Sequence, residues 1–175
     1  MDGNIILKPV VTREDAELTA SLAGKIWTEH YTPIIGSEQV EYMLDRFQSA
    51  DRIYSDITES GYVYHMAFSG DEPAGYCSAR LDPAAGELFL SKLYVEKSFR
   101  GRGIARMFLG VLRELAESNK CSHIRLTVNK YNSNSLKVYD RLGFKVAGSV
   151  VTDIGGGFVM DDYVMRLDLK DGLLI

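Results

Sequence analysis

Cysteine, tryptophan and histidine are scarce in this chain of 175 residues, which has two cysteines, one tryptophan and three histidines. Cys77 and Cys121 have neither metal-ligand nor redox spacing, so we expect two buried free thiols in a reducing compartment. His30, His65 and His123 share no metal-ligand spacing either. The sequence therefore predicts no metal site and no disulfide framework.

Long hydrophobic runs and an excess of basic residues are also missing. No apolar run approaches the roughly 20 residues that a membrane-spanning helix needs, and "MDGNIILKPV" lacks the basic start and apolar core of a signal peptide. Lys and Arg number 20 against 24 Asp and Glu, a net charge of −4, whereas nucleic-acid binders usually carry a basic face. We expect a cytoplasmic protein without membrane or nucleic-acid partners, suited to neutral or cationic ligands.

What the sequence does contain is an ordinary globular composition, 46% hydrophobic and 25% charged. There is no linker, repeat or low-complexity segment, so we expect residues 1–175 to form a single domain. Strand patterns occupy residues 4–10, 62–68, 74–81, 87–96, 123–128, 144–151 and 158–169. Helical spacing follows a capping box at Thr12 and Asp15 until Thr32-Pro33, and recurs at 37–47, 104–115 and 132–142. This order predicts a mixed α/β (α+β) sheet with helices on its faces.

A glycine-rich turn, "RGRGIA" at Arg100–Ala105, lies between a predicted strand and a predicted helix. Such a turn lets backbone N–H groups approach an anion, and the helix N-terminus adds a positive dipole end. The segment has no Gly-Lys-Ser/Thr and does not match GxGxxG, so it is neither a nucleoside-triphosphate loop nor a dinucleotide fingerprint. Taken alone, it is also compatible with a tight turn that carries solvated arginines.

A second segment follows about one strand later. In "NSNSLKVYDRLGF" Asn132 is placed to cap a helix, Tyr139 lies two turns further on, and Gly143 stops the helix. Together, "LYVEKSFRGRGIARMFLGVL" and NxxSxxxYxxLGF resemble the GNAT superfamily of N-acetyltransferases over residues 88–145. The resemblance implies a mostly antiparallel central sheet with one splayed pair of parallel strands and helices on both faces.

The resemblance also implies that acetyl-CoA is the co-substrate. Its pantetheine arm would lie between "FLSKLYV" and "HIRLTV" and pair with the backbone of Leu93 and Val95. Amides around Arg102, Gly103 and Ala105 would bind the pyrophosphate. Asn132 would hold pantetheine, although a helix cap alone explains it. The implied cofactor-binding residues are Leu93, Tyr94, Val95, Arg100, Gly101, Arg102, Gly103, Ile104, Ala105, Asn129, Asn132, Ser135 and Tyr139.

For the chemistry, the resemblance gives Tyr139 the role of the general acid that protonates the leaving thiolate. A tyrosine with a pKa of about 10 stays protonated at neutral pH. An alkyl amine, with a pKa near 10.4, must lose a proton before it attacks. Glu87 is a candidate base, although it lies six positions before Leu93, further back than usual in the family. The alternatives are that Tyr139 is a buried core residue and that Glu87 is a solvent-facing turn residue. The base is left unassigned.

The acceptor site would involve the early helices and the last strands. "IWTEHYTPIIG" gathers Trp27, His30 and Tyr31 at a helix end, for which core packing is the alternative. In "GGGFVMDDYVM" the period of a strand sends Asp161 and Asp162 to opposite faces, so at least one should face protein. A buried carboxylate needs a partner, and either a substrate ammonium or loop N–H groups could supply one. These segments look like bacterial polyamine-type members, which favours spermidine or spermine.

We therefore expect acetyl transfer from acetyl-CoA to a primary amine by direct attack in a ternary complex. The expected partner is a small-molecule amine, and a homodimer is compatible with this interpretation. Two alternatives keep the same motifs. One is an acetyltransferase for protein N-termini of the ribosomal-protein type, and the other is a non-catalytic acyl-CoA sensor.

Overall fold

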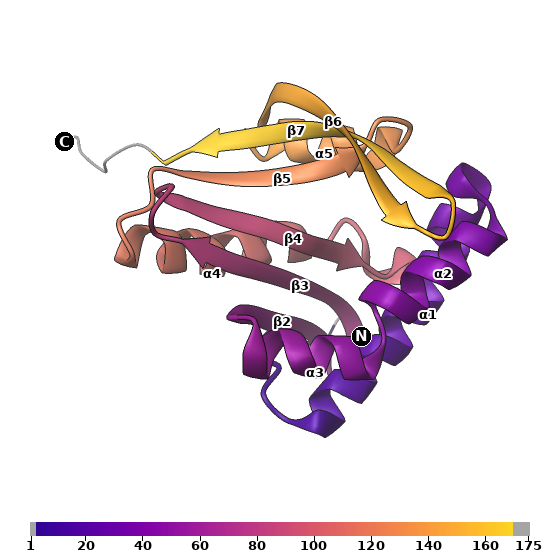
Figure 1. Cartoon of the computed structure of the whole chain (residues 1–175). Helices are drawn as coiled ribbons and strands as arrows, with labels where there is room; N and C mark the ends of the chain where they lie inside the picture. Colours follow the sequence, from indigo (N-terminus) through magenta and orange to yellow (C-terminus); the bar gives the residue numbers. More distant parts are fainter. Residues whose placement is uncertain (1–2, 170–175) are drawn as a thin grey trace. The chain divides into compact units, whose positions relative to one another are not determined.

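The computed structural model describes residues 3–169, and the chain divides into two compact units. Unit 1 holds the described residues up to Arg80 together with Lys92–Leu109, and unit 2 holds Leu81–Ser91 together with the described residues from Gly110 onward. The strand β4 (Glu87–Val95) and the helix α4 (Ile104–Ser118) contribute residues to both. The seven strands are hydrogen-bonded in the order β1-β2-β3-β4-β5-β7-β6, mostly antiparallel with one parallel pair, as expected (Figure 1).

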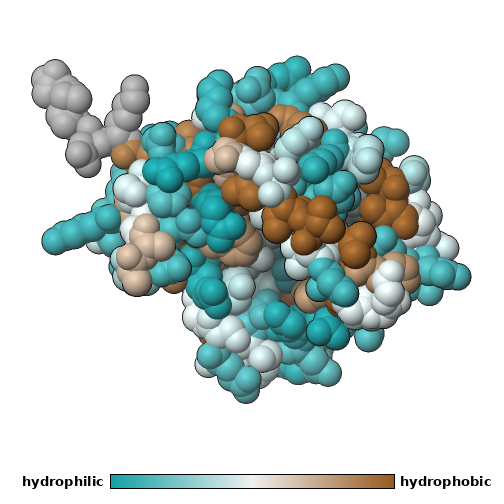
Figure 2. Space-filling view, turned by 45° about the horizontal axis from the view of Figure 1, so that its top comes forward, coloured by the Kyte–Doolittle hydropathy of each residue, from teal (hydrophilic) through white to brown (hydrophobic). Residues whose placement is uncertain are grey.

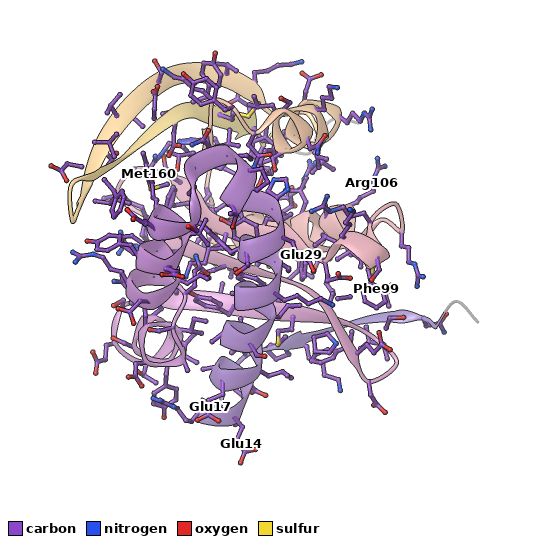
Figure 3. All side chains as sticks on the ribbon, turned by 90° about the vertical axis from the view of Figure 1, so that its right-hand side faces the viewer. Glu14, Glu17, Glu29, Phe99, Arg106 and Met160 are labelled. Carbon is purple, nitrogen blue, oxygen red and sulfur yellow. The ribbon has the colours of Figure 1, made fainter. Side chains whose placement is uncertain are left out.

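Unit 1 begins with β1 (Ile5–Pro9) and three helices, α1 (Arg13–Ile35), α2 (Ser37–Phe47) and α3 (Ala50–Glu59). The predicted capping box is present, because the Thr12 side chain accepts from the Asp15 N–H and the Asp15 carboxylate accepts from the Thr12 N–H. Glu14 also lies in this first turn, and Figure 3 shows it at the end of the helix with Glu17. Negative side chains here complement the positive end of the helix dipole.

These helices differ from the sequence prediction in two places. We expected Thr32-Pro33 to end the first helix, but α1 continues through Pro33 to Ile35. A proline inside a helix removes one N–H and crowds the carbonyl four residues before it, but Pro33 stands in the last turn of α1, where only Ile34 and Ile35 follow it. Gly36, with a φ of 87°, ends the helix and donates its N–H to the Thr32 carbonyl at 3.0 Å. The helix α3 was not predicted, because only Ile53 and Ile57 mark its apolar side.

The strands β2 (Tyr62–Ser69) and β3 (Glu72–Asp82) form the predicted hairpin. Gly75 in β3 faces the last part of β4 so closely that an added Cβ would lie 2.7 Å from the Tyr94 carbonyl oxygen. The short helix η1 (Lys97–Phe99) then leads into the turn before α4. Burial in unit 1 concentrates on large side chains of these elements, among them Trp27, Ile53, Tyr64, Met66, Tyr76 and Phe108.

Unit 2 contains β5 (His123–Asn129), α5 (Ser133–Arg141) and the hairpin of β6 (Lys145–Gly155) with β7 (Phe158–Asp168). The parallel ladder pairs Glu87 with His123 and ends at Leu90 with Leu126, although β5 continues to Asn129. On its other side β5 pairs with β7 along its whole length. This early end of the ladder agrees with the expected splayed pair.

The strand β6 is one of the two edge strands of the sheet and is exposed along most of its length. The exposed apolar side chains of the hairpin are Val146, Val150 and Val151 in β6 and Val159 in β7. Figure 2 shows hydrophobic residues among hydrophilic ones on the surface that faces the viewer. Within residues 3–169, no helix is long and apolar enough to cross a membrane.

Candidate active site

In unit 1 the predicted anion-binding turn lies directly before α4. Gly101 and Gly103 have φ values of 81° and 78°, which only glycine adopts without strain. A Cβ added at either position would meet nothing within 4 Å, so the surface beside the turn is open. The first hydrogen bond of α4 runs from the Met107 N–H to the Gly103 carbonyl, and the N–H groups of Ile104 and Ala105 precede it. This arrangement can receive an anion.

Three arginines surround this turn. Arg100 is exposed and its Nε donates to the Val95 carbonyl at 3.3 Å. The Arg102 guanidinium lies 5.2 Å from the ring centroid of Phe99. Figure 3 labels Phe99 and Arg106, the residues on either side of the turn. The exposed positive charge within an acidic chain adds to the helix dipole at this place.

The end of β4 is held by a buried lysine that sequence reasoning did not single out. Lys92 donates to the Phe47 carbonyl at 2.6 Å and to the Tyr64 hydroxyl at 2.7 Å, and it lies 3.8 Å from the Asp56 carboxylate. Burial lowers the pKa of Lys92 to about 8, against the raising effect of Asp56. A charged residue in the apolar stretch "FLSKLYV" was the available signal. These bonds fix the strand just before Leu93, Tyr94 and Val95.

The aromatic cluster predicted around α1 exists, and it is mostly core. Trp27 and Tyr31 stack with ring centroids 4.4 Å apart, and Tyr94 approaches the Trp27 ring edge-on at 5.4 Å. The Trp27 indole N–H donates to the Tyr76 hydroxyl at 3.2 Å. Trp27 is only 3% exposed, so its ring has little free surface for an ammonium group. His30 is half-buried and meets Tyr31 edge-on at 4.8 Å.

In unit 2 the predicted helix residues take their expected local places. Asn132 is buried and caps α5, accepting the Ser135 N–H at 3.3 Å. The Asn129 carbonyl oxygen of the side chain accepts the Tyr131 N–H at 2.9 Å. Tyr139 is buried on α5, with its ring 5.7 Å from that of Phe144 in an edge-on contact. The cap and the core-packing interpretations therefore both hold, and neither excludes a further role.

Glu87 lies at the opposite end of β5 from these residues. One carboxylate oxygen is 2.9 Å from His123 Nε2 and the other accepts from Arg125 Nε at 2.9 Å. Burial raises the pKa of Glu87, but the bonds from His123 and Arg125 outweigh it and hold that pKa below its ordinary value. Because Glu87 pairs with His123, it is about 20 Å along the strand from the level of Asn129, at ~3.3 Å per residue. We therefore do not assign the base to Glu87.

The carboxylates of Asp161 and Asp162 in β7 differ in burial and in partners, as expected for neighbours on opposite faces of a strand. Asp161 is half-buried and forms an ion pair with Lys130 at 2.9 Å. Asp162 is only 3% exposed, and its Oδ1 has no hydrogen-bond partner among the described residues. Burial and the neighbouring Asp161 raise the pKa of Asp162 to about 6, partly offset by Lys130. The loop N–H groups considered as partners do not reach this oxygen.

Comparison with known proteins decides the family. The profile of the acetyltransferase (GNAT) family matches residues 24–144, more than half of the chain. The chain belongs to the GNAT acetyltransferase family. Among its relatives is a probable spermine N(1)-acetyltransferase of Bacillus subtilis subsp. natto, 30% identical over 80 residues. That match covers 45% of this chain and spans only about half, 51%, of the relative's length.

Other members of the family match over most of the chain. An uncharacterized N-acetyltransferase of Mycobacterium tuberculosis is 26% identical over 156 residues, covering 89% of this chain and 98% of the relative. The crystal structure of the PaiA N-acetyltransferase from Thermoplasma acidophilum in complex with coenzyme A superposes with a TM-score of 0.79. That match covers 95% of this chain and 99% of the other at 21% identity. At this identity it shows the shared GNAT fold.

Proposed function

We propose that this protein transfers the acetyl group of acetyl-CoA to a primary amine of a small cationic acceptor, in a single ternary complex. The observation that carries the proposal is the turn at Arg100–Ala105, with two glycines at positive φ, open space beside them and the N-terminus of α4 directly after. The family to which the chain belongs is an acetyltransferase family. Such a turn suits the pyrophosphate of coenzyme A.

In this proposal separate groups of residues bind the cofactor and carry out the proton transfer. In unit 1 the backbone of Leu93 and Val95 binds the pantetheine amides, and the amides of Gly103–Ala105 bind the pyrophosphate. In unit 2 Tyr139 donates its hydroxyl proton to the thiolate that leaves. The neutral amine nitrogen forms the new bond to the acetyl carbon and the carbon–sulfur bond breaks. The nitrogen gives up one proton, which restores the tyrosine hydroxyl, and free coenzyme A and an amide are the products.

We propose a polyamine, such as spermidine or spermine, as the acceptor class. Three observations support this choice: the net charge of −4, the buried carboxylate of Asp162, and relatives named as spermine or spermidine acetyltransferases. An extended polycation gains from long-range attraction to an acidic protein. A peptide N-terminus is the alternative acceptor, because a protein-acetylating enzyme would carry the same cofactor motifs.

The test is a panel of acceptors in which the release of free coenzyme A is measured. Spermidine, spermine, a monoamine of similar length and several peptides with free N-termini are compared at equal concentration. We expect the highest kcat/KM with the polyamines and a lower value with the monoamine. Faster turnover of the peptides would replace the polyamine by a protein N-terminus. If the protein binds coenzyme A but releases none from acetyl-CoA with any acceptor, a non-catalytic sensor would be favoured.

A further inference from the structure

Asp162 is a buried carboxylate with one oxygen, Oδ1, that no described residue hydrogen-bonds. It is 3% exposed and its Oδ1 accepts no hydrogen bond from any residue of the described part of the chain. A buried charge without a partner costs stability, so native structures rarely keep one without a reason. Lys130, the cation whose charge acts on Asp162, is engaged by Asp161 at 2.9 Å and lies over the Tyr163 ring at 5.5 Å. An external cation would therefore find an unused acceptor here.

The register of β5 with β7 places Asp162 on the polar face of unit 2. Residues that pair across strands share a face, as do residues two apart in one strand. Asp162 pairs with Asn129, and the same face carries Thr127 and Arg125 in β5. The other face carries buried apolar residues, namely Ile124, Leu126 and Val128 of β5 with Met165 and Leu167 of β7. Asp162 therefore does not belong to the apolar core that fills the opposite face.

Asp162 is also at the right end of the sheet for acetyl transfer. Its partner Asn129 is the last residue of β5, and α5, which carries Tyr139, begins four residues later at Ser133. The parallel ladder with β4 has already ended at Leu126, which leaves this end of β5 outside it. Glu87, the other carboxylate considered as a base, lies at the far end of the same strand.

We propose that Asp162 is the general base that removes the proton from the acceptor's ammonium group. The inference rests on the function proposed above. Asp162 Oδ1 accepts one N–H proton, and the freed lone pair of the nitrogen forms the bond to the acetyl carbon. The carbon–sulfur bond then breaks, and the thiolate takes its proton from Tyr139. The nitrogen loses its second proton, which restores the Tyr139 hydroxyl, and the proton on Asp162 passes to solvent, so that a neutral amide and free coenzyme A are released. The ammonium thus serves both as the partner that Asp162 Oδ1 lacks and as the acid that Asp162 deprotonates.

The charges around Asp162 suit this role. Asp161 on the same strand and Lys130 after β5 are the charged groups that act on it, while its cross-strand neighbours Asn129 and Val150 are uncharged. Burial and Asp161 raise the pKa of Asp162 to about 6. A base with that pKa is mostly ionised near neutral pH and still basic enough to take a proton. An ordinary surface aspartate would be a much weaker base.

The experiment compares Asp162→Asn with Asp168→Asn, a matched control on the same strand and the same face whose carboxylate is exposed and pairs with Arg166. Initial rates of polyamine acetylation are measured from about pH 5.5 to 10. We expect Asp162→Asn to lower kcat near pH 7 by about 10²–10⁴-fold and Asp168→Asn to leave it unchanged. The defect should shrink as the pH approaches about 10, because the free amine then needs no base.

Three outcomes overturn the inference. In the first, Asp162→Asn keeps the wild-type rate and the wild-type loss of rate at low pH. In the second, the variant raises only KM, so that Asp162 binds the acceptor without taking its proton. In the third, the variant lowers kcat by the same factor at every pH. If Asp162→Asn does not fold, the pH profiles of the wild-type protein and of Asp162→Glu replace it. In the wild-type profile kcat/KM must decrease as the pH drops through an apparent pKa near 6, and in the Asp162→Glu profile this apparent pKa must be shifted. Failure of the proposed function is distinct, because the wild-type protein would then acetylate no amine.

Discussion

At the scale of single residues, Asp162 and Tyr139 have opposite relations to the fold. The Tyr139 ring packs edge-on against Phe144 and stabilises unit 2, whereas Asp162 gains no such contact for its Oδ1. A side chain that lowers stability where it stands is a common feature of functional sites. One substitution at each residue separates its contribution to stability from its proposed role in catalysis.

Replacing Tyr139 by phenylalanine keeps the ring and removes the hydroxyl. We expect a folded variant with unchanged acetyl-CoA affinity and a kcat lower by about 10²–10⁴-fold, the usual contribution of a general acid. Calorimetric titration of acetyl-CoA and steady-state rates measure the two quantities. Full activity between pH 6 and 9 would show that the hydroxyl is not the acid and that Tyr139 is a core residue only.

Replacing Asp162 by asparagine should raise stability at neutral pH. The pKa of Asp162 in the folded protein is about 6, above the ordinary value of 3.8, so the folded state binds this proton more tightly than the unfolded state. Stability therefore falls as the pH rises through this window. The variant lacks the titrating group and should gain ~1–3 kcal/mol near pH 7, a gain that disappears below about pH 4. Thermal unfolding across this range checks it, and a destabilised variant at pH 7 would contradict it.

At the scale of secondary-structure elements, the N-terminus of α4 is the feature on which the proposed cofactor binding depends. Its first N–H groups follow a turn whose two glycines adopt positive φ. Valine at Gly103 would test the turn poorly, because the φ of 78° strains any side chain whether or not a ligand binds. A change of charge within the first turn of the helix avoids that problem.

We expect Ala105→Glu to weaken coenzyme A binding far more than Ala105→Gln. Glutamate and glutamine have similar size, but only glutamate places a negative charge where the pyrophosphate would bind. A carboxylate in the first turn of a helix is otherwise favourable by about 0.3–1 kcal/mol, so the fold should not suffer. Isothermal titration of both variants gives the comparison. Equal affinities would move the pyrophosphate away from this turn.

The helices and strands also show which features the sequence could predict and why the other features could not be predicted. The capping box at Thr12 and Asp15, the helix at 37–47 and the cap by Asn132 depend on local patterns, and all three are confirmed. The end of α1 was misplaced because the rule that a proline breaks a helix applies to the helix interior, whereas Pro33 stands in the last turn, just before the cap at Gly36. The unpartnered oxygen of Asp162 and the bonds of Lys92 depend on residues distant in the sequence, which no local pattern reveals.

At the scale of the whole molecule, the net charge of −4 is the property that bears on the acceptor. Attraction between an acidic protein and a polyamine acts over distances at which salt screens it, because the Debye length is about 8 Å at physiological ionic strength. Each unit has its own buried core, and exposed charges of both signs lie outside these cores. Binding of the acceptor should therefore depend on the salt concentration more strongly than the rate of the acetyl-transfer step does.

We expect added salt to raise KM for spermidine while kcat stays nearly constant. Screening weakens the encounter of the polycation with the protein, whereas the reacting groups in the bound complex are shielded from added ions. Initial rates at several concentrations of sodium chloride measure both constants, with a neutral or singly charged amine as the control. A KM for spermidine no more sensitive than that of the control would contradict an electrostatic basis for acceptor choice.

The most direct test of the central claim, direct acetyl transfer from acetyl-CoA to an amine, is mass spectrometry of a single incubation sampled in two stages. The protein is first mixed with isotopically labelled acetyl-CoA alone, and spermidine is then added. The account predicts no labelled acetyl group on the protein in the first stage, then labelled acetylspermidine and an equal amount of free coenzyme A in the second. A stable acetyl-protein before spermidine is added, or no labelled acetylspermidine afterwards, would contradict it.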